Sequence, residues 1–236
     1  MSFVRTFRES AERAVALRRE ALAFARQFTL LHRDLPSVVP SGERELVVLV
    51  HGFLATAGVL RPLREHLEAE GHAVASFTHP PGIGVEELAA RVAELVRSAR
   101  AERLQLVGHS IGGLAARWFV QELGGDPRVV QTVSVASPFW GAWRARLVPG
   151  PLARDLHPDS DFLARLRAGI GQGVPHFAVS GSHDSVVGPA RPLGAAGELV
   201  AEGCGHNAVL YDRVVLESVA ARIRAHSLAA PPERAL

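Results

Sequence analysis

The 236-residue sequence has a single cysteine, no lysine and no long uninterrupted apolar run. Because Cys204 is alone, an internal disulfide is excluded. No apolar run approaches the ~18 residues that a membrane-spanning helix needs. Charges at Arg5, Arg8 and Glu9 interrupt the start of the chain, which argues against a cleaved secretory leader. We therefore expect a cytoplasmic protein, with contact at a membrane surface as the alternative.

Motifs for metals, nucleotides and nucleic acids are also missing. The sequence has no zinc-type Cys/His spacing, no glycine pattern of a phosphate or dinucleotide loop, and no basic stripe interleaved with aromatics. Every basic residue is arginine, yet the formal net charge is only +2. Arginines could favour an anionic lipid surface, whereas intramolecular ion pairs are the other interpretation. We expect no metal, no cofactor and no nucleic-acid partner.

Strand and helix patterns alternate along most of the chain. Such alternation predicts an α/β fold with a mainly parallel central sheet flanked by helices, and ligands at the carboxyl ends of the strands. Continuous apolar runs, typical of strands buried on both faces, and amphipathic segments define the elements. Strands are expected at 46–50, 73–77, 104–107, 129–135, 176–179 and 197–201, and helices at 59–70, 85–99, 110–123 and 208–227.

The segment LQLVGHSIGGL at 104–114 is an apolar strand that runs through Gly-x-Ser-x-Gly into a helix. This context is typical of a nucleophile elbow, in which Ser110 is raised on a tight turn. Gly108 and Gly112 fit because a Cβ there would collide with the turn or a neighbouring strand. His109 is expected to be a supporting neighbour. The alternative for Ser110 is a buried helix N-cap.

A serine hydroxyl needs a base, and the base needs an orienting carboxylate. Asp184 follows the strand at 176–179, and His206 follows the strand at 197–201. We therefore predict Ser110, Asp184 and His206 as the catalytic residues. Asp184 could instead be an ordinary turn residue, and ten other histidines compete with His206. The other candidate acids are Asp155, Asp159 and Asp161.

An oxyanion hole requires backbone N–H groups aimed at the developing charge. The strand at 46–50 ends in His51-Gly52-Phe53, the loop position that supplies one donor, and the residue after the nucleophile supplies the other. We assign the two donors to Phe53 and Ile111. His51 and Gly52 are expected to support this loop.

The motifs VVLVHGF, GHSIGG, SVASPFWGA, SGSHDSVV and GHNAVLYD together resemble the α/β-hydrolase superfamily, and within it the bacterial lipase and esterase branch. The resemblance covers roughly residues 44–226 and implies the α/β-hydrolase fold. Calcium-dependent lipases of this branch place a carboxylate after the catalytic histidine. Asn207 stands there in this chain, and Phe139 replaces a histidine of the lipase pattern. Neither the calcium site nor the role of that histidine is therefore carried over.

Two segments fall outside the alternation. Residues 139–173 are interpreted as a small helical cap, whose apolar side chains either shelter an acyl chain or pack within the cap itself. The expected acyl-pocket residues are Trp140, Trp143, Leu147 and Phe162.

The other segment, residues 1–38, precedes a catalytic domain at 39–228 and a loose tail at 229–236. Apolar residues recur every seven positions and predict one stripe on an amphipathic helix of about 30 residues. The helix is expected to dock on its own domain; a homodimer contact or a membrane surface are the alternatives. The stripe comprises Phe3, Phe7, Ser10, Ala14, Leu17, Ala21, Phe24, Phe28 and Leu31.

These features predict a serine hydrolase, a lipase-like carboxylic ester hydrolase that cleaves apolar esters or lipids through an acyl-enzyme on Ser110. His206 is expected to act as general base and acid, with Asp184 orienting it. An acyl thioesterase or acyltransferase would use the same triad. A non-catalytic scaffold that binds a partner through the first helix and the cap is the third hypothesis.

Overall fold

Six parallel strands form the centre of the fold in the part of the chain that is described. The computed structural model describes residues 2–31, 43–143 and 150–227. The strand order is β2-β1-β3-β4-β5-β6, and every neighbouring pair is parallel. The predicted parallel α/β architecture is therefore confirmed. The strands are β1 (Glu45–Val50), β2 (Val74–Phe77), β3 (Arg103–His109), β4 (Val129–Val135), β5 (His176–Gly181) and β6 (Gly197–Ala201).

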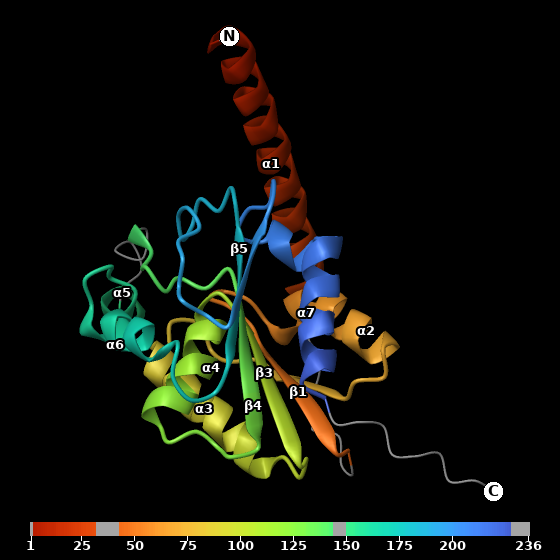
Figure 1. The fold of residues 1–236 in the computed structure, drawn as a ribbon, viewed down its shortest axis with the longest axis vertical. Coiled ribbons are helices and arrows are strands. Elements are labelled where there is room, and N and C mark those ends of the chain that lie inside the picture. The colour runs from red at the N-terminus through yellow and green to blue at the C-terminus, as the bar shows by residue number, and fades with distance from the viewer. Residues whose placement is uncertain (1, 32–42, 144–149, 228–236) are drawn as a thin grey trace, which may run out of the picture.

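Helices cover both faces of this sheet (Figure 1). Alternate strand residues point to opposite faces, so Val48 packs in the core under α3 and α4, whereas Val47 and Leu49 pack in the core under α2 and α7. The helices are α1 (Ser2–Leu31), η1 (Ala57–Leu60), α2 (Arg61–Ala69), α3 (Val85–Ser98), α4 (Ile111–Glu122), α5 (Pro151–Asp155), α6 (Asp161–Gly169), η3 (Ala208–Tyr211) and α7 (Arg213–Ala225).

The final helix predicted at 208–227 is divided in two. A 3₁₀ turn, η3, comes first, and α7 starts anew at Arg213. Asp212 separates them because its carboxylate accepts hydrogen bonds from the N–H groups of Val214 (3.0 Å) and Val215 (3.2 Å). An aspartate that caps a helix in this way favours a new start over continuation.

The segment predicted as a cap packs beside α3 and α4. In α6, the ring of Phe162 stacks on Trp118 with centroids 4.3 Å apart. The buried guanidinium of Arg117 fixes the chain after α6 by donating to the carbonyls of Gly169 (2.8 Å) and Val174 (2.5 Å). Residues 144–149, and with them Leu147, lie outside the described residues.

The N-terminal helix α1 docks on its own chain through its second half, while its first half projects away from the body (Figure 1). The docking face is not the predicted apolar stripe. Ala16, Ala23 and Leu30 are buried, whereas Leu17, Phe24 and Phe28 of the stripe are more than half exposed. The apolar stripe is therefore not the buried face of α1. The small side chains of Ala16 and Ala23 allow the helix to approach the domain closely, which the large side chains of the stripe would not. Membrane contact and dimer contact through α1 stay predictions.

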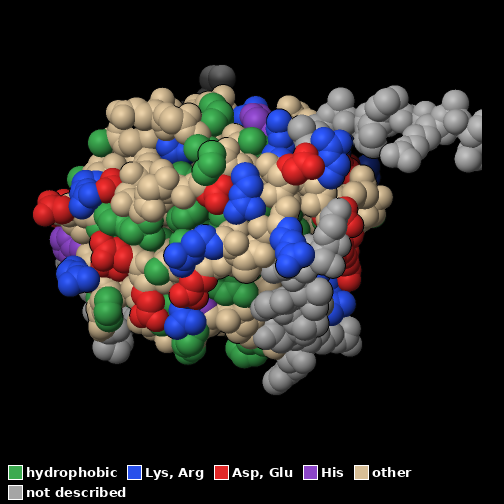
Figure 2. Space-filling model, turned by 90° about the horizontal axis from the view of Figure 1, so that it is seen from below, with side chains coloured by type: hydrophobic (Ala, Val, Ile, Leu, Met, Phe, Trp, Pro, Cys, Tyr) green, Lys and Arg blue, Asp and Glu red, His purple; other side chains and the backbone are tan. Residues whose placement is uncertain are grey.

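Charged side chains of both signs are interspersed on the face of the molecule in Figure 2. Ion pairs within single helices join charged side chains of the described residues, such as Arg64 with Glu68 (2.8 Å) and Arg91 with Glu87 (3.0 Å). Among the helices that are described, none has the length and apolar character needed to cross a membrane.

Candidate active site

Ser110 occupies the sharp turn between β3 and α4. Its backbone φ of 55° and ψ of −124° lie outside the regions that a serine normally adopts, so the surrounding structure must hold this strained conformation. Part of the restraint is the hydrogen bond from the Ser110 N–H to the Val135 carbonyl (2.9 Å). The hydroxyl is thereby lifted above the carboxyl edge of the sheet.

The two glycines of the motif let this turn form. A Cβ on Gly108 would lie 2.2 Å from the carbonyl carbon of Gly112. A Cβ on Gly112 would lie 2.2 Å from the Val50 carbonyl oxygen on β1. No side chain fits at either position, which is the steric reason that the sequence pattern predicted.

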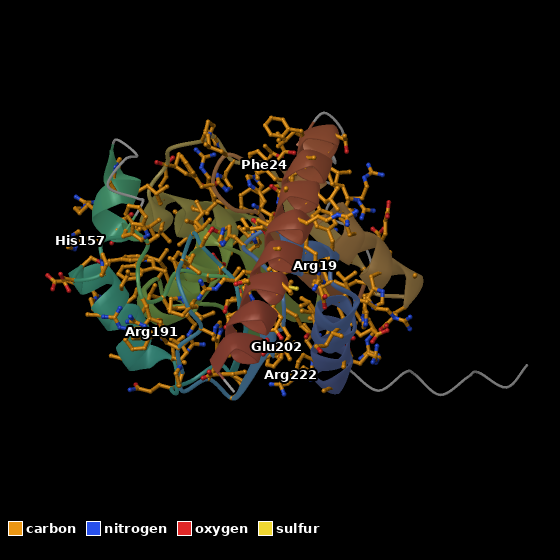
Figure 3. All side chains as sticks on the ribbon, turned by 90° about the horizontal axis from the view of Figure 1, so that it is seen from above. Arg19, Phe24, His157, Arg191, Glu202 and Arg222 are labelled. Carbon is orange, nitrogen blue, oxygen red and sulfur yellow. The ribbon has the colours of Figure 1, made fainter. Side chains whose placement is uncertain are left out.

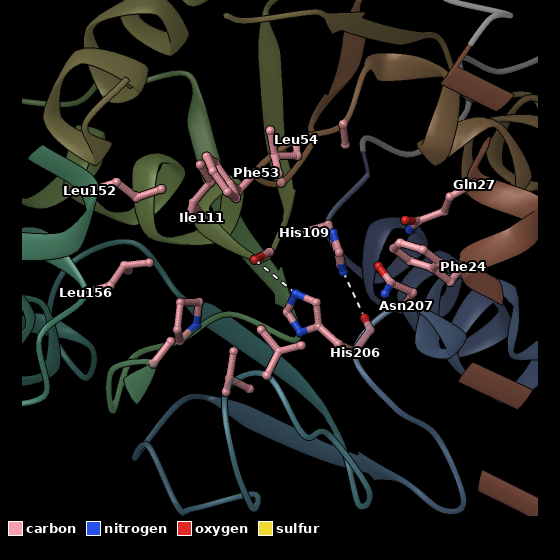
Figure 4. A pocket seen from close by; sticks show the side chains of 17 residues that line it. Phe24, Gln27, Phe53, Leu54, His109, Ile111, Leu152, Leu156, His206 and Asn207 are labelled. Atoms are coloured by element: carbon pink, nitrogen blue, oxygen red, sulfur yellow. Dashed lines mark hydrogen bonds between the residues drawn. The ribbon is translucent and has the colours of Figure 1, made fainter. Parts of the chain in front are cut away.

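The three predicted catalytic side chains form one hydrogen-bonded row. His206 Nδ1 lies 2.8 Å from Asp184 Oδ2. On the other side of the ring, His206 Nε2 lies 3.1 Å from Ser110 Oγ (Figure 4). Since a carboxylate only accepts, Nδ1 carries the proton and Nε2 presents its lone pair to the serine hydroxyl. All three residues are at least nine-tenths buried, so this row lies largely out of contact with bulk water.

Asp184 is held as an anion by the groups around it. Burial alone raises the pKa of its carboxyl group, but hydrogen bonds from His206 and from two backbone N–H groups outweigh burial and lower that pKa. The backbone donors are Val186 and Val187, which reach Oδ1 at 2.8 and 2.9 Å. A carboxylate fixed on both oxygens can orient the imidazole and stabilise its charged form.

His109 lies beside Ser110 but turns away from its hydroxyl. Its Nε2–H donates to the backbone carbonyl of His206 at 3.0 Å, and its Nδ1 has no hydrogen-bond partner among the described residues. Burial lowers the pKa of His109 to about 3, so the imidazole stays neutral at neutral pH. It therefore acts as a donor to the His206 backbone.

A pair of stacked imidazoles holds the loop after β1. His51 Nδ1–H donates to the Gly52 carbonyl (2.8 Å), and His51 Nε2 accepts from the His79 N–H (3.1 Å). The two rings lie parallel with centroids 3.9 Å apart, and burial lowers the pKa of His79. His79 was missed by the sequence reasoning, although its place just after β2 was an available signal.

A cavity of about 300 Å³ opens over Ser110 and is lined mainly by apolar side chains (Figure 4). Phe53 and Ile111, the two predicted oxyanion-hole residues, both contribute to its wall. Leu152 and Leu156 close it from α5 and the residue that follows. Phe24 of α1 contributes a further wall and was not predicted to do so.

The predicted acyl-pocket residues do not line this cavity. Phe162 is buried against Trp118, and Trp143 is 62% exposed. Trp140 lines a separate small pocket, and the guanidinium of Arg167 lies 4.8 Å from the centroid of its ring. Phe162 is thus used for packing and Trp140 for cation–π contact, while Trp143 is largely exposed, so the pocket assignment was wrong for the three that are described.

Cys204 is close in sequence to His206, but its thiol is unreactive. It is fully buried, and its thiol lies 3.5 Å from Asp212 Oδ2. Burial, together with the nearby Asp212 carboxylate, raises the pKa of the thiol to about 12. A thiol that is hardly ionised is a poor nucleophile, so Cys204 is a small buried residue and not a reactive thiol.

The sheet and the strand–elbow–helix unit have the α/β-hydrolase fold, and the fold predicted from the sequence is confirmed. Residues 40–148 match a family model described as "Putative serine esterase (DUF676)". That match includes the loop after β1 and the elbow, but ends before Asp184 and His206. It supports a hydrolase of the serine esterase kind.

Solved structures with this fold include several lipolytic proteins. A structure of the metagenome-derived lipolytic enzymes LipS and LipT is 20% identical, with a TM-score of 0.61 over 82% of this chain and 100% of that one. A lipase-esterase related protein of Clostridium acetobutylicum is 15% identical, with a TM-score of 0.57 over 80% and 97%.

The Bacillus licheniformis lipase BlEst2 in its propeptide form is also 15% identical, with a TM-score of 0.63 over 86% of this chain and 55% of that one. At these identities the likeness concerns the fold. Among curated proteins, none matches the sequence.

Proposed function

We propose that this protein is a serine carboxylic ester hydrolase that cleaves apolar acyl esters through an acyl-enzyme on Ser110. The observation that carries the proposal is the row Asp184–His206–Ser110, with separations of 2.8 and 3.1 Å. A hydroxyl, an imidazole and a carboxylate in this order are the parts that activate a serine for acyl transfer.

In the proposed reaction, His206 Nε2 takes the hydroxyl proton as Ser110 Oγ attacks the ester carbonyl carbon. The resulting imidazolium then gives this proton to the leaving alkoxide as the tetrahedral intermediate collapses. A water molecule, deprotonated by the same Nε2, hydrolyses the acyl-enzyme and returns Ser110 to its hydroxyl form. Asp184 keeps the proton on Nδ1 throughout, so Nε2 is always the atom that exchanges protons.

The negative charge of the tetrahedral intermediate needs fixed donors. The backbone N–H groups of Phe53 and Ile111 are the proposed pair, and the position of both residues on the cavity wall beside Ser110 supports this assignment. Loss of one such donor typically reduces kcat by ~10²–10³-fold. The stacked pair His51 and His79 would keep the loop that carries Phe53 in place.

The substrate class follows from the walls of the cavity. Leu152, Leu156, Phe53 and Phe24 are apolar, and the cavity volume of about 300 Å³ accommodates an acyl group and not a large polar molecule. Such a site binds an uncharged acyl chain mainly by removing its surface from water. Apolar esters are therefore the proposed substrates, and lipids are included among them.

Covalent labelling with a fluorophosphonate tests the proposal. The wild-type protein is expected to be labelled at Ser110, and Ser110→Ala is expected to lose both labelling and ester hydrolysis while keeping its melting temperature. Labelling that persists in Ser110→Ala would remove Ser110 as the nucleophile. A folded wild-type protein that is neither labelled nor active on any ester would favour the non-catalytic scaffold.

A panel of p-nitrophenyl esters of increasing acyl length, with matched acyl thioesters, would then define the substrate. Saturation by short soluble esters would indicate an esterase, and a rise in rate above the critical micelle concentration would indicate a lipase. Thioester turnover far above that of the matched oxygen esters would favour the thioesterase alternative.

A further inference from the structure

The middle of α1 carries two charged residues that face the turn between β6 and η3. This turn, residues 202–207, holds His206. Arg19 and Glu20 are partly buried there, on the same side of the helix as the buried Ala16 and Ala23. Arg19 and Phe24 are labelled in the view from above, where α1 crosses over the body of the molecule (Figure 3).

The Glu20 carboxylate binds the chain directly after His206. Its Oε1 accepts hydrogen bonds from the backbone N–H of Asn207 (3.0 Å) and from Asn207 Nδ2 (2.8 Å). Its Oε2 accepts from the N–H groups of Asn207 (3.1 Å) and Ala208 (3.0 Å). Four hydrogen bonds from three donors therefore hold one carboxylate against the start of η3.

The same carboxylate also touches the chain directly before His206. A Cβ on Gly205 would lie 2.4 Å from Glu20 Oε2, so only a glycine leaves room for this approach. Both neighbours of His206 in the chain thus contact Glu20. From the other side, His109 donates to the His206 carbonyl at 3.0 Å. The backbone of His206 is therefore clamped between the elbow and α1.

We propose that Glu20 is a positioning residue for the hydrolysis assigned above: by fixing residues 205–208, it keeps the imidazole of His206 within reach of Ser110. This inference rests on the proposed function and makes α1 a part of the active site. The reasoning is geometric, since proton transfer depends on the Nε2–Oγ separation of 3.1 Å, and a displacement of about 1 Å in such a site can reduce the rate by about 10²-fold.

Arg19 provides a matched control. It lies next to Glu20 on α1 and also ties the helix to the domain, through Asp212 Oδ2 (2.5 Å) and the carbonyls of Glu202 and Gly203 (both 3.3 Å). None of these groups is adjacent to His206 in the chain. Loss of Arg19 therefore weakens the docking of α1 without removing a contact to the neighbours of His206.

The experiment compares Glu20→Ala, Glu20→Gln and Arg19→Gln with the wild-type protein. For each, kcat and KM on a short p-nitrophenyl ester, the rate of fluorophosphonate labelling and the melting temperature are measured. In Glu20→Ala, kcat and the labelling rate are expected to fall about 10- to 100-fold with KM changed less than about threefold. Arg19→Gln is expected to lower the melting temperature comparably but to keep kcat within about twofold of wild type.

Glu20→Gln keeps one acceptor oxygen but turns an NH₂ group toward the N–H groups that Oε2 accepts from. A loss of kcat between those of Arg19→Gln and Glu20→Ala is therefore expected for Glu20→Gln. This variant provides the test of the proposal if Glu20→Ala does not fold. The proposal is overturned if the Glu20 variants keep the wild-type kcat, or if kcat falls equally in Arg19→Gln at equal loss of stability. If the wild-type protein itself is not labelled at Ser110, the proposed function fails instead, and the two failures are distinguishable.

Discussion

Acid should destabilise this fold through its buried imidazoles, and His176 on β5 allows the effect to be isolated. Its ring lies between Thr132 Oγ1 (2.7 Å from Nδ1) and Ser134 Oγ (3.0 Å from Nε2), and it is 1% exposed. Burial, assisted by the positive charge of Arg117, lowers the pKa of His176 to about 3.

The sign of the effect follows from proton binding in the two states. In the unfolded chain the imidazole has a pKa near 6.5, so between about pH 6.5 and pH 3 the unfolded state binds a proton that the folded state does not. The stabilisation by neutral His176 is therefore complete above pH 6.5 and is lost as the pH falls. One proton bound only by the unfolded state gives a slope of about 1.4 kcal/mol per pH unit, or roughly 2 to 3 kcal/mol between pH 6 and pH 4.

The assay is the free energy of unfolding in denaturant at closely spaced pH values from about 6 to 4. His176→Asn is expected to lower stability at pH 7, because it leaves a buried hydroxyl without its partner, but to reduce the acid slope by about 1.4 kcal/mol per pH unit. Val133→Ala on the neighbouring strand, a buried position without a proton to bind, should shift the curve downward and leave its slope unchanged. Equal slopes in His176→Asn and the wild type would refute the reasoning.

Three further outcomes are expected. Asp184→Asn should keep the fold but reduce kcat by about 10⁴-fold, because an amide can favour the wrong imidazole tautomer; a loss below about tenfold would contradict this role. Cys204, with the pKa of its thiol raised to about 12, should resist iodoacetamide at pH 8 in the native protein and react promptly in denaturant; fast native alkylation would contradict its burial. Gly112→Ala should lower the free energy of unfolding by more than about 3 kcal/mol, since its Cβ would lie 2.2 Å from the Val50 carbonyl oxygen. At Gly124 only the positive φ of 81° opposes an alanine, so Gly124→Ala should lower it by about 1 kcal/mol. Thermal or chemical denaturation measures both, and equal losses would contradict the steric argument.

The parts of the molecule that local patterns encode were predictable from the sequence. The strand at 129–135 and the strand at 197–201 have the predicted bounds, because apolar runs between turn residues are a local signal. The elbow was also predictable, because the Gly-x-Ser-x-Gly pattern between a strand and a helix is a local signal, although the steric reason for Gly112 is the distant Val50 carbonyl on β1. The placement of Asp184 and His206 after successive strands was predictable because parallel strands bring their carboxyl ends to one edge.

Interactions between distant segments could not be predicted in this way. The buried face of α1 contains Ala16, Ala23 and Leu30 together with the partly buried Arg19 and Glu20. A hydrophobic periodicity instead selects Leu17, Phe24 and Phe28, which are exposed. The contact between Glu20 and Asn207 joins residues 187 positions apart, and no local pattern records it. Trp140 and Phe162 were assigned to the pocket as large apolar residues of the predicted cap, but the direction of a side chain in such a segment of short helices and turns depends on what packs against it.

The projecting half of α1 has a practical consequence for how the protein can be handled. A helix rises about 1.5 Å per residue, so an attachment at Ser2 lies roughly 27 Å along the axis from Glu20. An affinity tag, a fluorophore or a solid support fixed at that tip would stay remote from the cavity mouth. Ala16 is the first buried side chain among residues 10–31 of the helix, so a truncation that removes it would damage the docking of α1.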